Sequence, residues 1–170
     1  MGYAEPLLAT TDSSNNEETD VWVLFSLDGQ TYALRIWEVE RIVRAVEVRP
    51  LPESPAHILG VVNIQGRVLP VVDLRARFGK PSRDISLDDH FIVTWATGSS
   101  AVVLPVDAAL GSQQIAGGTI PEDEIARTQC LSKVLTLGNE MVYALDLKKL
   151  VAADDLPAET YSSSMRARLE

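Results

Sequence analysis

The segment that most constrains the fold is residues 60–74, where two apolar runs meet at Gln65-Gly66. Val, Ile and Leu fill both runs, a composition typical of strands packed on a core. Pro70 has no backbone N–H to donate, so we expect the second strand to lie at a sheet edge or to carry a bulge there. Asp73, at its end, has the position of an N-cap for a short helix. The segment therefore predicts a β-hairpin turning at Gly66, followed by a capped helical turn.

Composition places the chain among ordinary globular proteins. Its 170 residues are 46% hydrophobic and 23% charged, and no apolar run approaches the ~20 residues of a membrane span. Nothing at the N-terminus marks the chain for export. The single cysteine, Cys130, cannot form an internal disulfide and fits a reducing cytoplasm, where we expect a buried, inert thiol. We therefore expect a cytoplasmic protein with no direct membrane insertion.

The net charge of −9 is unevenly spread along the chain. Residues 1–20 contain five acids and no base, and we expect this tail and residues 152–170 to be disordered because they are small, polar and acidic. The body between them is nearly neutral and has no basic stripe, which argues against nucleic acid as a partner.

Further strand and turn signals lie on both sides of the central segment. Asp28-Gly29 between apolar runs is a strong hairpin signal. Residues 36–43 place Ile36, Val39 and Val43 at helical spacing, which predicts a short helix or helical turn. Ser54-Pro55 predicts a single helical turn. Residues 80–89 are polar and irregular, which predicts a linker.

The same order of elements recurs in the second part of the chain. Strand, turn, strand, loop and an Asp-Leu cap occur in residues 21–80 and again in 88–151, where Asp146 takes the position of Asp73. The recurrence predicts a duplicated β unit within one domain of residues 21–151. Because strands can be exchanged between the two units, these ranges mark the sequence repeat only. Many short strands separated by turns favour barrels over an open sheet.

The sequence offers few candidate residues for a catalytic or metal-binding site. His57 lies on a predicted turn, where a surface or partly packed imidazole is the expected role. His90 follows Asp88-Asp89, but no second His or Cys group is spaced to complete a metal site, so a solvated linker is the favoured interpretation. We therefore expect no catalysis, no cofactor and no metal.

A binding surface remains, where polar residues interrupt apolar runs. The simplest interpretation of these residues is structural: Asn63 bonds local backbone, Val39 and Val43 fill the core, and the charged side chains are solvated. The alternative is partner contact, for which the candidates are Val39, Arg41, Ile42, Val43, Gly60, Asn63, Gln65 and Arg67.

Residues 60–74 also resemble the signature segment of CheW-like coupling proteins of bacterial chemotaxis, G-x-x-N-L-R-G-x-x-x-P-V-x-D-L. The matching positions are Gly60, Asn63, Gly66, Pro70, Val71, Asp73 and Leu74. The similarity extends over residues 21–151, through Tyr32-Ala33-Leu34, Val106-Asp107 and Leu145-Asp146-Leu147. It implies a mainly β fold of two small five-stranded, SH3-like barrels side by side, with short helices.

The resemblance also implies a function. CheW-like proteins are non-enzymatic adaptors that join a chemoreceptor's cytoplasmic tip to the regulatory domain of the histidine kinase CheA, within receptor arrays. Their receptor groove includes the positions of Val39, Arg41 and Gln65, where the family usually carries Glu at the second and Arg at the third. Both differ here. Two alternatives stay open: a regulatory CheW-like domain of a larger kinase or receiver fusion and, more distantly, a small-molecule-binding barrel.

Overall fold

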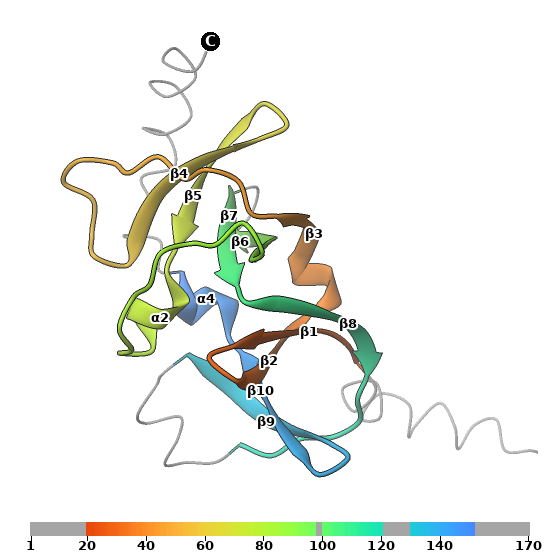
Figure 1. Ribbon diagram of the computed structural model, residues 1–170. Helices are drawn as coiled ribbons and strands as arrows, with labels where there is room; N and C mark the ends of the chain where they lie inside the picture. The colour runs from red at the N-terminus through yellow and green to blue at the C-terminus, as the bar shows by residue number, and fades with distance from the viewer. Residues whose placement is uncertain (1–19, 98–99, 121–129, 152–170) are drawn as a thin grey trace, which may run out of the picture.

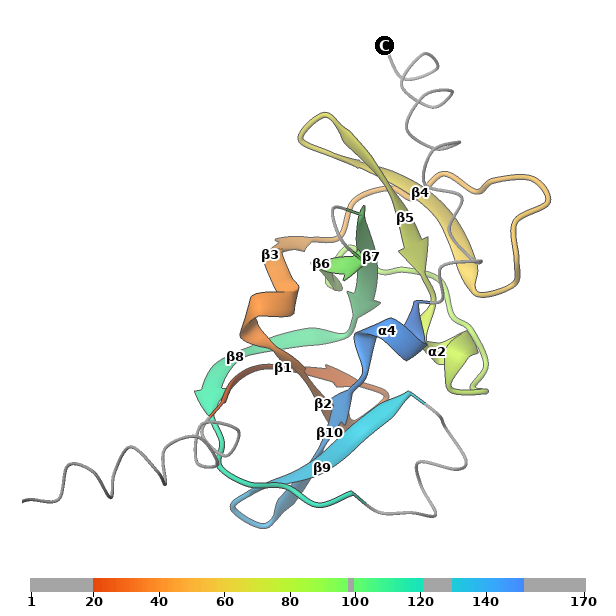
Figure 2. The ribbon, with the colours of Figure 1, turned by 180° about the vertical axis from the view of Figure 1, so that it is seen from behind.

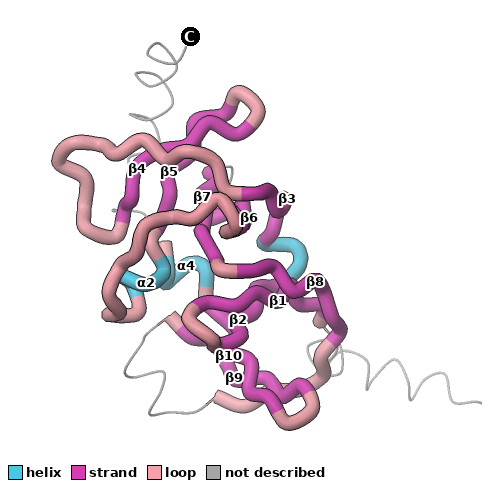
Figure 3. Tube along the Cα trace, in the orientation of Figure 1, coloured by secondary structure: helices cyan, strands magenta, loops and turns pink. Residues whose placement is uncertain are grey.

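The computed structural model describes residues 20–97, 100–120 and 130–151, and the two predicted disordered tails lie outside them apart from Asp20. Within these ranges, ten strands form two five-stranded sheets, and α2 (Leu74–Arg77) and α4 (Leu147–Leu150) lie between the sheets (Figure 1). The predicted fold class is therefore confirmed: the chain is mainly β, with few and short helices (Figure 3). No helix in the described ranges is long and apolar enough to cross a membrane.

Each sheet combines strands from both parts of the chain. The first sheet has the order β8-β1-β2-β10-β9, made of Ala108–Gln114, Val21–Leu27, Gln30–Arg35, Glu140–Leu145 and Leu131–Leu137. The second has the order β3-β6-β7-β5-β4, made of Val39–Arg44, His90–Thr97, Ser100–Val106, Arg67–Val72 and Ile58–Ile64. The two orders correspond strand by strand, since β1–β2 matches β6–β7 and β10–β9 matches β5–β4.

The strands after each leading hairpin are exchanged between the sheets. After β2, the chain passes through the 3₁₀ turn η1 (Ile36–Glu38) into β3, which pairs with β6 of the other sheet. After β7, it enters β8, which pairs back with β1. Figures 1 and 2 show both crossings, from the front and from behind. Neither sheet therefore corresponds to the sequence range 21–80 or 88–151 alone.

Two isolated bridges bring the last edge strand of each sheet against the chain that follows its first edge strand. Arg49, beyond β3, pairs with Val61 of β4, and Thr119, beyond β8, pairs with Val134 of β9. In the first bridge each residue donates its N–H to the other's carbonyl, at 2.8 and 2.9 Å. These contacts close each sheet on itself, which removes part of its open edge.

Three apolar clusters form the core. One fills the second sheet and includes Phe91 and Val93, and another fills the first sheet and includes Trp22 and Leu135. The largest takes side chains from both sheets and both helices. Because this cluster is shared, we expect the two sheets to unfold as one cooperative unit.

The predicted hairpin turns and aspartate helix caps are present in the structure. Asp28-Gly29 and Gln65-Gly66 both have two successive positive φ angles, of 52° and 81° and of 52° and 85°, as two-residue hairpin turns require. Asp73 accepts a hydrogen bond from the backbone N–H of Arg75 at 3.0 Å and so caps α2. Asp146 caps α4 in the same way.

Two helix predictions were confirmed only in part. Residues 39–44 form the strand β3, and only Ile36–Glu38 make a 3₁₀ turn. The apolar spacing suited a helix, but the β-branched residues pair with β6 instead. Ser54-Pro55 begins no helix: the Ser54 hydroxyl donates to the carbonyl of Leu51 at 3.1 Å, and Ile58 N–H donates to Pro55 across a turn.

Pro70 does not lie on an edge strand, so that prediction was wrong. β5 lies between β4 and β7, and the ladder irregularity nearby is on the partner strand, between Ile58 and Gly60. The parallel pairing of β5 with β7 is confined to Val71 and Val103. A ladder this short leaves few regular bonds for a proline to interrupt.

Candidate partner-binding surface

The strand β3 divides the predicted contact residues between two faces. Ile42 lies opposite Ile92, and the Ile92 side chain is in the core shared by the sheets. Arg41 lies opposite Val93, and the Val93 side chain is in the core of the second sheet. Directly opposed residues of an antiparallel pair share a face. Ile42 therefore lies on the face toward the first sheet, and Arg41 on the face toward the β4–β5 hairpin.

The tip of the β4–β5 hairpin is braced from within. Asn63 Oδ1 accepts a hydrogen bond from the backbone N–H of Gly66 at 2.8 Å. Gln65 has a left-handed backbone, with φ of +52°, a conformation that residues other than Gly, Asn and Asp rarely adopt. Asn63 thus fixes the turn, and Gln65 lies exposed within it.

Charged side chains tie this tip to β3. Arg67 Nη1 donates to both carboxylate oxygens of Glu40, at 2.7 Å each. Arg41 Nε lies 3.2 Å from Glu40 Oε2, and Arg41 Nη1 donates to Gln65 Oε1. The two positions that depart from the family pattern, Arg41 and Gln65, are therefore in direct contact with each other.

An exposed aromatic side chain completes the cluster. The Arg67 guanidinium carbon lies 5.7 Å from the centre of the Trp95 ring, within cation–π range. Trp95 is 39% exposed. We call Glu40, Arg41, Gln65, Arg67 and Trp95 the hairpin-tip surface. Sequence reasoning included Glu40 in the candidate stretch 39–43 without singling it out, and it missed Trp95. Alternation along β6 would have placed Trp95 on the side of Phe91 and Val93.

Asn63 lies at the hairpin tip, whereas the candidates Gly60, Val39 and Val43 lie away from this surface. Gly60 is buried, and a Cβ atom there would lie 2.1 Å from the carbonyl oxygen of Arg49. Val39 is half-buried and packs on the core shared by the sheets, and Val43 packs on the core of the second sheet. Among the candidates, Arg41, Gln65 and Arg67 are therefore brought together.

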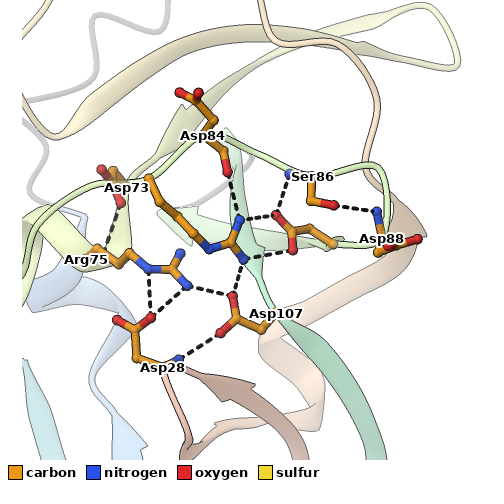
Figure 4. A network of polar contacts seen from close by, with 9 residues as sticks. Asp28, Asp73, Arg75, Asp84, Ser86, Asp88 and Asp107 are labelled. Carbon is orange, nitrogen blue, oxygen red and sulfur yellow. Dashed lines mark hydrogen bonds and ion pairs between the residues drawn. The ribbon is translucent and has the colours of Figure 1, made fainter.

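A second polar cluster joins the two sheets (Figure 4). Arg75 of α2 reaches Asp28 of the β1–β2 turn at 3.0 Å and Asp107, between β7 and β8, at 2.6 Å. Arg83 pairs with Asp107 and with Asp89, the latter at 2.8 Å. Asp28, Arg75 and Asp107 thus connect elements of both sheets.

The predicted solvated linker at residues 80–89 is part of this cluster. Asp89 is 5% exposed, and it accepts hydrogen bonds from Arg83 and from the backbone N–H of Ser86. Most of the segment is irregular and exposed, as predicted, but Asp89 departs from the prediction because Arg83, which binds it, also pairs with the distant Asp107. No group of three or more His, Cys, Asp or Glu side chains in the described ranges could hold a metal ion.

We expect the protein to lose stability in acid because of this cluster. Burial alone would raise the pKa of Asp107, but hydrogen bonds from the Asp28 amide, Arg75 and Arg83 outweigh it and lower the pKa. The pKa of Asp89 is lowered through Arg83 and Ser86 in the same way. Since the unfolded chain then binds more protons, this stability is present above the ordinary carboxylate pKa of about 4 and falls as the pH drops through the folded pKa.

The measurement is urea unfolding between about pH 6 and pH 3, with D107N as the test variant. An asparagine at this position cannot titrate, so the variant should be less stable at pH 6 and lose less stability on acidification than the wild type. Equal slopes in the two proteins would contradict the assignment to Asp107.

Cys130 is expected to be inert in the folded protein. It is 4% exposed, and burial is the main cause that raises the pKa of its thiol. Since the thiolate is the reactive form, an aromatic disulfide reagent should label Cys130 only as the protein unfolds. Rapid labelling in native buffer would show that the thiol is accessible.

A surface cavity of about 420 Å³ lies beside the edge strand β4. Its lining is Val46, Glu47, Val48, Leu59, Arg83, Asp84, Ile85 and Leu87. Leu87 is 78% exposed, so the cavity opens to solvent. The space enclosed by each curled sheet is instead filled by apolar side chains. This arrangement does not favour the small-molecule-binding barrel.

Comparison with known proteins gives a consistent result. A sequence model described as "CheW-like domain" matches residues 22–155. The chain is 26% identical to a chemotaxis protein CheW of Klebsiella aerogenes, with 79% of this chain and 83% of that protein covered, and 28% identical to one of Rhizobium meliloti, with 80% and 90% covered. The crystal structure of the scaffolding protein TtCheW from Thermoanaerobacter tengcongensis is similar, with a TM-score of 0.72 and 27% identity over 81% of this chain and 95% of that one.

Proposed function

The chain belongs to the CheW-like domain family of non-enzymatic scaffolding proteins in chemotaxis signalling, and we propose that it joins the cytoplasmic tip of a chemoreceptor to the regulatory domain of a CheA-type histidine kinase. It would do so in the cytoplasm, within membrane-associated receptor arrays. The proposal concerns the partners, which the family relationship implies only in general terms.

The observation that carries the proposal is the hairpin-tip surface. It includes Arg41 and Gln65, two positions at which the family resemblance implies receptor contact. Its arginines and Trp95 are exposed, while Glu40, Gln65 and the Trp95 ring restrain the arginines. Side chains fixed before binding lose little entropy in a complex, and Arg and Trp are enriched among residues that dominate binding energy. These properties suit a protein-binding surface.

The test is reconstitution from purified parts. The kinase regulatory domain and soluble receptor cytoplasmic fragments from the source organism are titrated separately into the protein by calorimetry and then mixed with it. We expect each to bind alone and a ternary complex to elute together in size-exclusion chromatography. Failure of the protein to bind either fragment, or competition between the two for one site, would contradict an adaptor role.

A further inference from the structure

The hairpin-tip surface presents hydrogen-bond donors to solvent, whereas its side-chain acceptors already accept from its own arginines. The carboxylate of Glu40 is shared by Arg41 and Arg67, and its side chain is only 12% exposed. Gln65 Oε1 accepts from Arg41. By contrast, the side chains of Arg41 and Arg67 are 41% and 39% exposed. A guanidinium carries five N–H donors, so both arginines keep donors that these contacts do not use.

The charge balance points the same way. Two arginines against one shielded glutamate leave a net positive charge at the hairpin tip, although the whole chain carries −9. The guanidiniums are also restrained, Arg41 by Glu40 and Gln65, and Arg67 by Glu40 and the Trp95 ring. A planar, restrained guanidinium matches the geometry of a carboxylate and can bind it through two parallel hydrogen bonds.

We propose that the hairpin-tip surface recognises a carboxylate side chain, presented on the receptor's cytoplasmic segment beside an apolar side chain that packs on Trp95. This assignment of partner chemistry rests on the proposed adaptor function. Arg41 is the specificity-determining residue, since it replaces the acid that the family usually carries there. An acid at that position would repel the carboxylate that Arg41 attracts.

The first test uses a defined probe. A helical peptide carrying Glu and Leu on one face is titrated into the ¹⁵N-labelled protein, beside an analogue in which Gln replaces each Glu. We expect the Glu peptide to shift the side-chain N–H resonances of Arg41 and Trp95. Its affinity should be at least tenfold higher than that of the Gln peptide, and high salt should weaken it. Arg44 is the internal control, because its side chain is 70% exposed on the same strand and its ion pair with Asp88 is long, at 3.8 Å.

The second test uses the receptor fragment. R41Q should weaken receptor binding by about tenfold or more and leave kinase binding unchanged, while R44Q should change neither. Equal effects of R41Q and R44Q on receptor affinity, or equal affinities for the Glu and Gln peptides, would overturn the inference. If the wild type selected the Glu peptide at this surface but bound no receptor fragment, carboxylate recognition would stand and the proposed adaptor function would fail.

Discussion

Replacing Gly60 with alanine is expected to destabilise the protein by roughly 4 kcal/mol or more, which is exceptional for a single methyl group. The residue has φ of +149°, and a Cβ would lie 2.1 Å from the carbonyl oxygen of Arg49 and 2.7 Å from its carbon. Both are backbone atoms, held by the Arg49–Val61 bridge that closes the second sheet. The alanine must therefore break that closure or force an unfavourable backbone. Thermal and urea unfolding measure the loss, which should lower the melting temperature by roughly 10 °C.

The matched control is G66A. Gly66 also has a positive φ, of +85°, but no atom lies within 4 Å of the position that its Cβ would occupy. That substitution carries only the cost of a left-handed alanine, about 1 kcal/mol. If G60A and G66A melted at the same temperature, the Arg49 segment would have to move away easily, and the sheet closure would contribute little to stability.

Features determined by a few neighbouring residues could be predicted from the sequence. The turns at Asp28-Gly29 and Gln65-Gly66 need positive φ angles, and the carboxylate caps at Asp73 and Asp146 need only backbone N–H groups two or three residues ahead. Such interactions are encoded within four residues. The order of these signals indicated a duplicated β unit, and the resemblance of residues 60–74 to the CheW-like signature implied the two five-stranded barrels.

Features that depend on distant partners could not be predicted in the same way. Residues 39–44 became a strand because β6, which begins about 50 residues later, pairs with them. Exchange between the two units was expected, but its identity as β3 and β8 is set by pairing between sheets, which leaves no periodic signal in either segment. The local apolar spacing at Ile36 and Val39 was compatible with a helix until those partners were known.

The candidate site shows the same division. Gln65 and Arg67 could be predicted to lie at a hairpin tip, but their contacts with Arg41 and Glu40 span 24 and 27 residues. Trp95 comes from a third strand. In the same way, Arg75 and Arg83 draw on aspartates from the β1–β2 turn and from the junction of β7 and β8. Only the fold brings these charges together.

The second large effect is expected in partner choice. The double substitution R41E and Q65R restores the acid and base that CheW-like proteins usually carry at these positions. Because Arg41 and Gln65 contact each other at the surface, the exchange should reverse the polarity of their interaction and change stability by no more than about 0.5 kcal/mol. Receptor affinity should change far more, by at least tenfold, since like charges opposed at an interface are strongly unfavourable. Titration of the wild-type receptor fragment and of a conventional CheW-binding receptor fragment measures the change.

Two comparisons separate recognition from folding. Kinase binding should persist in the double variant, because we propose that the kinase uses another face, and R44E on the same strand should leave both receptor affinities near their wild-type values. The glutamate introduced at position 41 lies beside Glu40. The arginine introduced at position 65 and Arg67 balance these two negative charges, so the side chains of the cluster can stay in contact. If receptor affinity were unchanged while the melting temperature fell by several degrees, Arg41 and Gln65 would be structural residues. The receptor would then bind elsewhere, and the hairpin-tip surface would lose its proposed role.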